Sequence, residues 1–64
     1  MFKTKKEFIL ALTEGRRFKL PHGVICYYDD EWGIPFLCKP DRKGYTRSMD
    51  DYEFDAYKEA EEVE

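Results

Sequence analysis

The sequence has few of the side chains that catalytic and metal centres usually require. His22 is the single histidine, and Cys26 and Cys38 are the only cysteines, with eleven residues between them. Structural zinc sites take four ligands, usually in close pairs, and a catalytic Cys–His pair needs mutual hydrogen-bond reach and an orienting group. We therefore expect no metal, no cofactor and two free thiols packed as small apolar groups.

Glycine clusters and long apolar runs are also absent. The four glycines stand singly between predicted elements, so there is no glycine-rich phosphate loop. No stretch approaches the roughly 20 apolar residues of a membrane span, and residues 1–15 lack the apolar core and cleavage site of a signal peptide. We expect a cytoplasmic protein with reduced thiols and no membrane contact.

Aromatic and acidic side chains, by contrast, are plentiful. Aromatic residues make up 17% of the 64-residue chain, too many for the thin core of one small domain, so some should be exposed and able to anchor a partner. The acidic loop 29–31 lacks the ligand spacing of a calcium-binding loop. A domain of this size also has little room for a second carboxylate across a cleft, and we expect no enzymatic activity.

Local patterns predict a helix followed by short strands. Thr4 and Glu7 match a capping box in front of an apolar helical face, and Gly15 suits the end of this helix, predicted over 5–14. Alternating or β-branched residues predict strands at 17–20, 24–28 and 34–39, with a short fourth at 45–47 as an option. The short turns require antiparallel pairing, and Pro35 indicates a strand start or a sheet edge.

A second helix is predicted near the C-terminus. Acidic residues 50 and 51 suit its first turn, and apolar side chains recur at helical spacing from Met49 to Val63. The acidic end, about residues 60–64, is expected to fray. The predicted fold is one α+β domain, a small antiparallel three- to four-stranded meander flanked by an N-terminal and a C-terminal helix.

Charge is distributed unevenly along the chain, whose net charge is −3. Residues 1–25 hold six basic and two acidic side chains, and residues 49–64 hold eight acidic and one basic. The two segments either attract each other within the fold or present separate faces to partners.

The opening of the chain is similar to that of small orphan proteins of bacteriophages and mobile elements. The step Glu14-Gly15-Arg16-Arg17 links the predicted helix to an aromatic-rich strand pair, a similarity that covers residues 4–30. It transfers no functional residue. The resemblance implies a protein that binds one host protein and alters or blocks it.

The favoured function is a non-enzymatic module that binds a host or cognate protein as an inhibitor or modulator. The hairpin end around Trp32 and the acidic last helix, which can also imitate the phosphates of DNA, are the expected contact surfaces. Truncating an exposed Trp32 to alanine should weaken binding by about 2 kcal/mol. The expected contact residues are Tyr28, Asp29, Asp30, Glu31, Trp32, Asp51, Glu53 and Asp55.

Two alternatives remain open. A nucleic acid can bind the basic N-terminal region through its phosphates, with a tyrosine stacking a base, although the sequence pI of about 5.1 argues against this. The other is a homodimer formed through exposed aromatics and an edge strand near Pro35. The residues expected at a nucleic acid are Lys5, Lys6, Arg16, Arg17 and Lys19.

Overall fold

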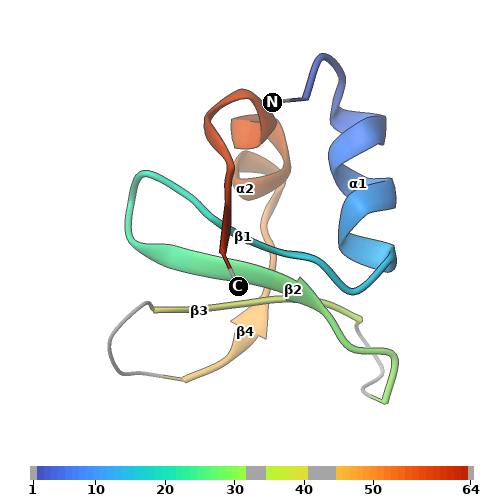
Figure 1. Ribbon diagram of the computed structural model, residues 1–64. Coiled ribbons are helices and arrows are strands. Elements are labelled where there is room, and N and C mark those ends of the chain that lie inside the picture. Colours follow the sequence, from blue (N-terminus) through green and yellow to red (C-terminus); the bar gives the residue numbers. More distant parts are fainter. Residues whose placement is uncertain (1, 32–34, 41–44, 64) are drawn as a thin grey trace.

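Among the residues that the structure describes, five short antiparallel strands form a sheet, and two helices cover one of its faces (Figure 1). The computed structural model describes residues 2–31, 35–40 and 45–63. This arrangement confirms the predicted α+β class. In chain order the elements are α1 (Lys5–Thr13), β1 (Arg17–Lys19), β2 (Val24–Tyr28), β3 (Phe36–Pro40), β4 (Arg47–Ser48), α2 (Asp51–Asp55), the 3₁₀ helix η1 (Ala56–Glu59) and β5 (Glu61–Val63).

Helix α1 forms where the capping box predicts it. The backbone N–H of Glu7 donates to the Thr4 hydroxyl at 3.2 Å, and the Glu7 carboxylate accepts from the Thr4 N–H at 3.0 Å. Two otherwise unpaired groups at the helix start are thereby satisfied. The helix ends at Thr13 because Gly15 follows with a φ of 91°, a left-handed conformation that glycine adopts without strain.

The first four strands form the predicted meander, and β5 pairs with the free side of β1, so the order in the sheet is β4-β3-β2-β1-β5. Gly23 closes the β1–β2 turn with a φ of 87°, and its N–H donates to the Leu20 carbonyl at 3.0 Å. Strand β3 pairs with β2 along its length and with β4 at Leu37 and Cys38. Pro35 thus lies directly before the start of β3, as the first of its two predicted positions requires, and because β3 is an interior strand the alternative of a sheet edge near Pro35 is wrong.

The C-terminal segment differs from the single long helix that the sequence predicts. Helix α2 ends at Asp55, η1 adds one tighter turn, and Glu61–Val63 form β5 rather than a frayed end. Acidic side chains are unfavourable in the last turn of a helix, where the dipole is negative. As a strand beside β1, the same segment instead places Glu61 opposite Lys19.

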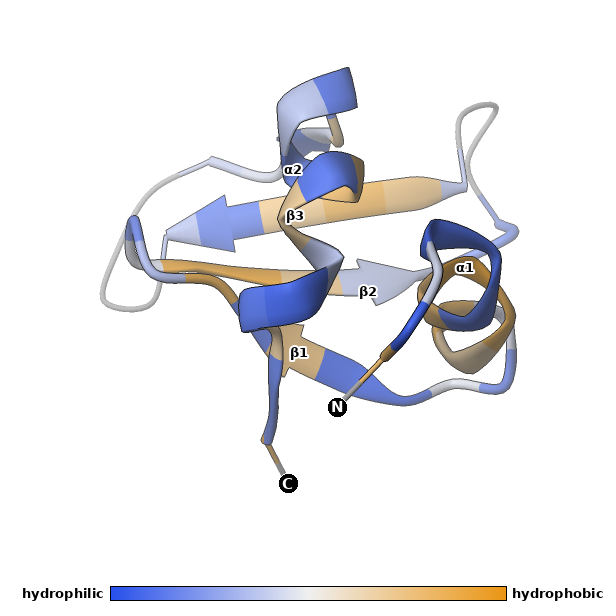
Figure 2. Ribbon diagram, turned by 90° about the horizontal axis from the view of Figure 1, so that it is seen from above, coloured by the Kyte–Doolittle hydropathy of each residue, from blue (hydrophilic) through white to orange (hydrophobic). Residues whose placement is uncertain are grey.

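The core lies between the helices and the sheet. The rings of Phe8 and Phe18 meet edge to face at 5.5 Å, and Phe2 packs on both. Cys26 and Cys38 face each other across β2 and β3, fully buried and not joined by a disulfide. Figure 2 shows the matching pattern on α1, which is hydrophilic toward the viewer and hydrophobic toward the sheet.

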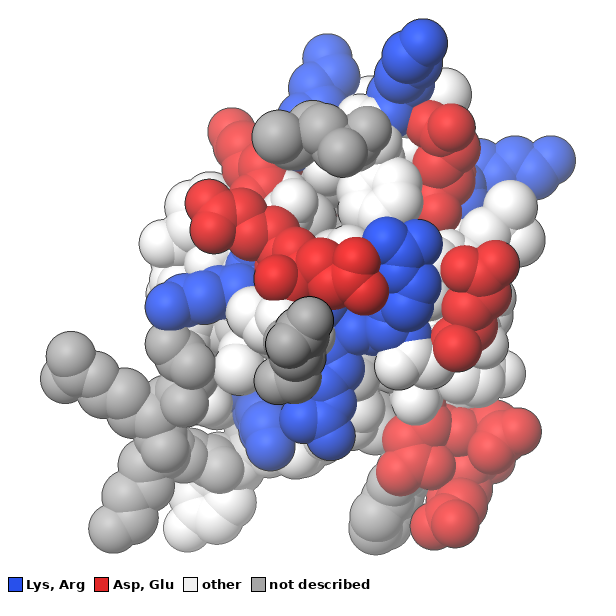
Figure 3. Space-filling view, viewed as in Figure 1, with Lys and Arg blue, Asp and Glu red and all other residues white. Residues whose placement is uncertain are grey.

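The basic N-terminal and acidic C-terminal segments attract each other within the fold. Lys5 forms an ion pair with Asp55 at 3.1 Å, and Arg16 forms a two-armed pair with Glu62 at 2.7 and 3.0 Å. Basic and acidic side chains are accordingly interspersed in Figure 3 rather than gathered on separate halves. The Arg16–Glu62 pair also holds β5 against the start of β1.

Candidate functional site

The sheet has a second face that neither helix covers. Successive side chains of a strand point to opposite faces, and Phe18, Cys26 and Cys38 point into the core. Their neighbours along each strand therefore point away from the helices, below the sheet in Figure 1. This surface, called the open face from here on, consists among the described strands of Arg17, Lys19, Ile25, Tyr27, Leu37, Lys39, Ser48, Glu61 and Val63.

Register aligns charged and apolar residues across the open face. Ile25 lies directly opposite Lys19 on one side and Lys39 on the other. Ile25 is partly exposed and does not belong to the core cluster, whereas Leu37 is buried with only 6% of its surface accessible. The accessible apolar surface is thus centred on β2 and flanked by two lysines.

Tyr27 lies beside this row, and neighbouring side chains hold it in place. The Lys39 ammonium is 5.9 Å from the centre of the Tyr27 ring, within the range of a cation–π contact. The Tyr27 hydroxyl is hydrogen-bonded to the Thr46 hydroxyl at 3.1 Å. The ring is therefore packed into the open face rather than projecting from it.

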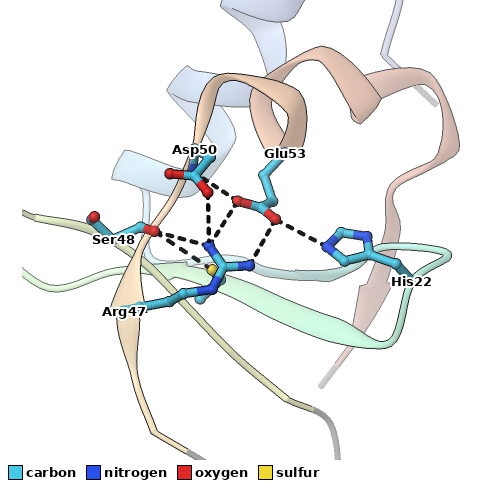
Figure 4. A network of polar contacts seen from close by, with 6 residues as sticks. His22, Arg47, Ser48, Asp50 and Glu53 are labelled. Carbon is cyan, nitrogen blue, oxygen red and sulfur yellow. Dashed lines mark hydrogen bonds and ion pairs between the residues drawn. The ribbon is translucent and has the colours of Figure 1, made fainter.

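A buried carboxylate forms the most connected polar cluster on the helix side. The Glu53 side chain has no accessible surface. Its oxygens accept two hydrogen bonds from Arg47, at 3.1 and 2.9 Å, and one from the Asp50 N–H at 2.7 Å. His22 Nε2 lies 3.0 Å from the same carboxylate. We call these four residues the Glu53 network (Figure 4).

The network keeps Glu53 ionised. Hydrogen bonds from Arg47, opposed in part by burial and supported by the Asp50 N–H and His22, lower the pKa of Glu53 to about 2. Glu53 in turn raises the pKa of Arg47. An ionised carboxylate only accepts hydrogen bonds, so His22 Nε2 must carry the proton and donate it.

The Glu53 network is a structural cross-link by its geometry. It joins β4 through Arg47, the β1–β2 turn through His22, and the start of α2 through Asp50. The Tyr52 ring packs on the His22 ring, with the ring centres 4.8 Å apart. Because a buried charge is costly unless fully paired, these contacts fix α2 to the sheet.

Both thiols are poor nucleophiles in this environment. Burial raises the pKa of Cys26 to about 12, and burial likewise raises the pKa of Cys38. The thiolate is the reactive form, so neither cysteine is activated for covalent chemistry. The described residues include no group of three or more side chains placed to hold a metal ion, and no helix among them is long and apolar enough to cross a membrane.

The expected protein-contact residues fall in different environments. Tyr28 is partly buried and packs on Phe36 at 5.1 Å, while Asp30 and Glu31 are exposed. The Asp29 carboxylate accepts from the Glu31 N–H at 3.0 Å, a local turn contact. Trp32 lies outside the described residues, so the prediction for its truncation stays a prediction.

The acidic side chains of α2 are less available to a partner than the sequence predicts. Asp51 is exposed, but Asp55 is paired with Lys5. Glu53 is in the interior, where its carboxylate cannot meet a partner. This corrects its expected role, because Arg47 and the helix start bind it instead.

The expected nucleic-acid residues do not form one patch. Lys5 and Lys6 belong to α1, on the helix side, whereas Arg17 and Lys19 point to the open face. Lys39 and Ile25 join the latter pair, although sequence reasoning did not select them. The period-two alternation of β2 and β3 carried the necessary signal, but only the register shows that these side chains are neighbours.

Comparison with known proteins gives no match: no family model, no curated protein and no solved structure is significantly similar to the chain.

Proposed function

We propose that the protein is a non-enzymatic module that binds another protein through the open face, and that it acts as an inhibitor or modulator of that partner. The observation that carries the proposal is the partly exposed apolar centre at Ile25, framed by charged side chains and left uncovered by both helices. An apolar centre with a charged rim is the usual composition of a protein-binding surface.

The chemistry of the polar groups supports a role in binding rather than catalysis. The Glu53 carboxylate is engaged by three neighbours, which leaves it no capacity to abstract a proton from a ligand. The raised pKa values of Cys26 and Cys38 make both thiols poor nucleophiles. Two buried free thiols also suit a reducing compartment such as the cytoplasm.

A second candidate, nucleic-acid binding, is favoured by one observation. Arg17, Lys19 and Lys39 share the open face with Tyr27, and basic side chains beside an aromatic ring are typical of surfaces for single strands. Of the five residues expected at a nucleic acid, this surface contains Arg17 and Lys19 but not Lys5, Lys6 or Arg16.

The test is capture of binding proteins from host lysate by the tagged protein and two matched variants, with and without nuclease. Ile25→Gln removes the apolar centre of the open face, and Leu10→Gln makes the same change on α1, where Leu10 is 54% exposed. We expect one stoichiometric protein to survive nuclease and to bind Ile25→Gln at least tenfold more weakly, which corresponds to about 1.4 kcal/mol. Leu10→Gln should retain it.

Other outcomes decide against the proposal. If all captured material disappears with nuclease, the second candidate replaces it. If no saturable protein is captured, or if both variants retain the partner equally, the open face is not the binding surface. Circular dichroism of each variant shows whether a loss reflects binding or unfolding.

A further inference from the structure

We infer that Cys26 and Cys38 form a site of reversible oxidative modification, at which a disulfide bond joins β2 to β3 on the core side of the sheet. The two thiols are free in this structure. Their pairing follows from the register of the two strands and from the hydrogen bonds around them. The site is independent of the proposed function, because both side chains point away from the open face.

The two cysteines lie directly opposite each other on neighbouring antiparallel strands. Opposite residues of such strands alternate between two kinds of pair. In a hydrogen-bonded pair the Cα atoms are about 5.5 Å apart, whereas in a non-hydrogen-bonded pair they are about 4.5 Å apart and the side chains are closer. The backbone hydrogen bonds near Cys26 and Cys38 decide which kind this pair is.

The end of the β2–β3 ladder assigns the cysteines to a non-hydrogen-bonded pair. The Asp29 N–H donates to the Pro35 carbonyl at 2.9 Å, and these residues continue the register by one position beyond β2. Because the two kinds of pair alternate, the third position back from this hydrogen bond is non-hydrogen-bonded. That position is Cys26 with Cys38.

The hydrogen bonds between β1 and β2 give the same assignment. The Leu20 N–H donates to the Val24 carbonyl at 3.0 Å, so the pair two positions along, Phe18 with Cys26, is also of the hydrogen-bonded kind. Cys26 therefore directs its backbone groups toward β1 and faces β3 through its side chain alone. A Cα separation of about 4.5 Å falls within the range of about 4.4–6.8 Å that disulfides span.

The surroundings of the two thiols allow the bond to form without loss of another interaction. Both side chains are fully buried in the apolar core. The Cys38 thiol makes one weak contact, to the Ser48 carbonyl at 3.9 Å. Oxidation removes this donor, but the same carbonyl still accepts from Arg47 Nη1 at 3.1 Å. No buried polar group is left without a partner.

A low-molecular-weight disulfide such as oxidised glutathione is a sufficient oxidant. One cysteine, as its thiolate, attacks a sulfur of the oxidant, which releases one thiol and leaves a mixed disulfide on the protein. The second cysteine then attacks the protein sulfur of that mixed disulfide and expels the second thiol. The protein loses two hydrogens and two electrons, and both pass to the released thiols. An excess of thiol reverses the reaction.

Burial controls how fast this reaction proceeds. Both thiols are protonated in the closed fold, because burial raises their pKa values, and the thiolate is the reactive form. Attack therefore requires a local opening of the sheet. Strand β4, which pairs with Cys38, is two residues long and lies at the sheet edge, where opening costs less than in the core. The site is thus slow to oxidise without being inaccessible.

The first test compares the oxidised and reduced forms of the wild-type protein. The disulfide is formed with oxidised glutathione in denaturant, and the monomer is then refolded beside a sample kept in a phosphine reductant. If the native register fits the bond, the cross-link constrains mainly the unfolded chain. We expect a higher urea midpoint for the oxidised form, equivalent to roughly tenfold or greater stabilisation of the fold. An equal or lower midpoint, or failure of the oxidised form to refold, overturns the inference.

The second test uses a variant in which one thiol is moved to the other face. Cys26→Ala combined with Ile25→Cys places this thiol opposite Lys39, while Cys38 stays in the core. Folded wild type and variant are equilibrated in glutathione redox buffer, free thiols are alkylated, and masses are measured. We expect an intramolecular disulfide in wild type and mainly mixed disulfides with glutathione in the variant.

The other outcomes count against the site. If wild type gives only mixed disulfides or cross-linked dimers, the register does not bring the thiols together. If the variant forms the intramolecular bond as readily as wild type, closeness in sequence rather than register explains it. Circular dichroism shows whether the variant folds, and if it does not, the stability comparison on wild type decides.

Discussion

Replacing Glu53 by glutamine should remove a large part of the stability of this domain. The folded structure lowers the pKa of Glu53 from 4.5 to about 2, which by linkage corresponds to roughly 3 kcal/mol of stabilisation at neutral pH. Glutamine keeps the size of the side chain but loses its charge, and its N–H₂ group faces the donors of Arg47 and His22. A domain of this length is stable by only about 3–10 kcal/mol in total.

The assay is denaturant unfolding followed by far-ultraviolet circular dichroism. We expect Glu53→Gln to lower the free energy of unfolding by about 3 kcal/mol at pH 7. Asp55→Asn, which removes an exposed partner of Lys5, should change it by no more than about 0.5 kcal/mol. Two variants of similar stability would refute the assignment of Glu53 as a structural cross-link.

The pH dependence gives an independent check on the same residue. A carboxyl whose pKa is lowered on folding stabilises the protein above its unfolded pKa, and this contribution is lost as the pH falls through the folded value. The stability difference between wild type and Glu53→Gln should therefore be constant above about pH 5 and shrink as the pH falls toward about 2. A difference that persists at low pH would contradict the role of the charge.

Three further predictions address the thiols, the helix cap and the last strand. Cys26 and Cys38 should be alkylated by iodoacetamide on the order of a hundredfold more slowly in the native protein than in denaturant, because burial raises both pKa values; equal rates would show that the sheet opens readily. Thr4→Ala should lower the free energy of unfolding by about 1 kcal/mol through loss of the cap, as denaturant titration can measure. Glu62→Lys should speed hydrogen exchange of the β5 amides by removing the pair with Arg16, and unchanged exchange would show that backbone pairing alone holds β5.

The elements that sequence reasoning predicted correctly depend on neighbours within a few residues. The capping box at Thr4, the glycine that ends α1 and the glycine of the β1–β2 turn each act on the adjacent backbone. Strand β2 follows from a continuous β-branched and aromatic run. Antiparallel order then follows from the short turns, so the α+β class is a consequence of local signals.

The errors arise where a residue's environment is set by a distant segment. Glu53 is a first-turn acid in the sequence, as suited to solvent as Asp51, and only the folded positions of Arg47 and His22 bury it. Strand β5 likewise exists because β1, more than forty positions earlier, presents an edge with basic side chains.

These long-range ion pairs also determine which charged side chains are engaged within the fold. Asp55 and Glu62 bind the protein's own Lys5 and Arg16, so the acidic segment is largely engaged within the fold. These ion pairs lie on the helix side of the sheet and at the β5 edge. On the open face, the basic residues Arg17, Lys19 and Lys39 outnumber the acidic residue Glu61. A chain with an acidic net charge thus has one sheet face on which basic side chains outnumber acidic ones, and composition alone does not reveal that local sign.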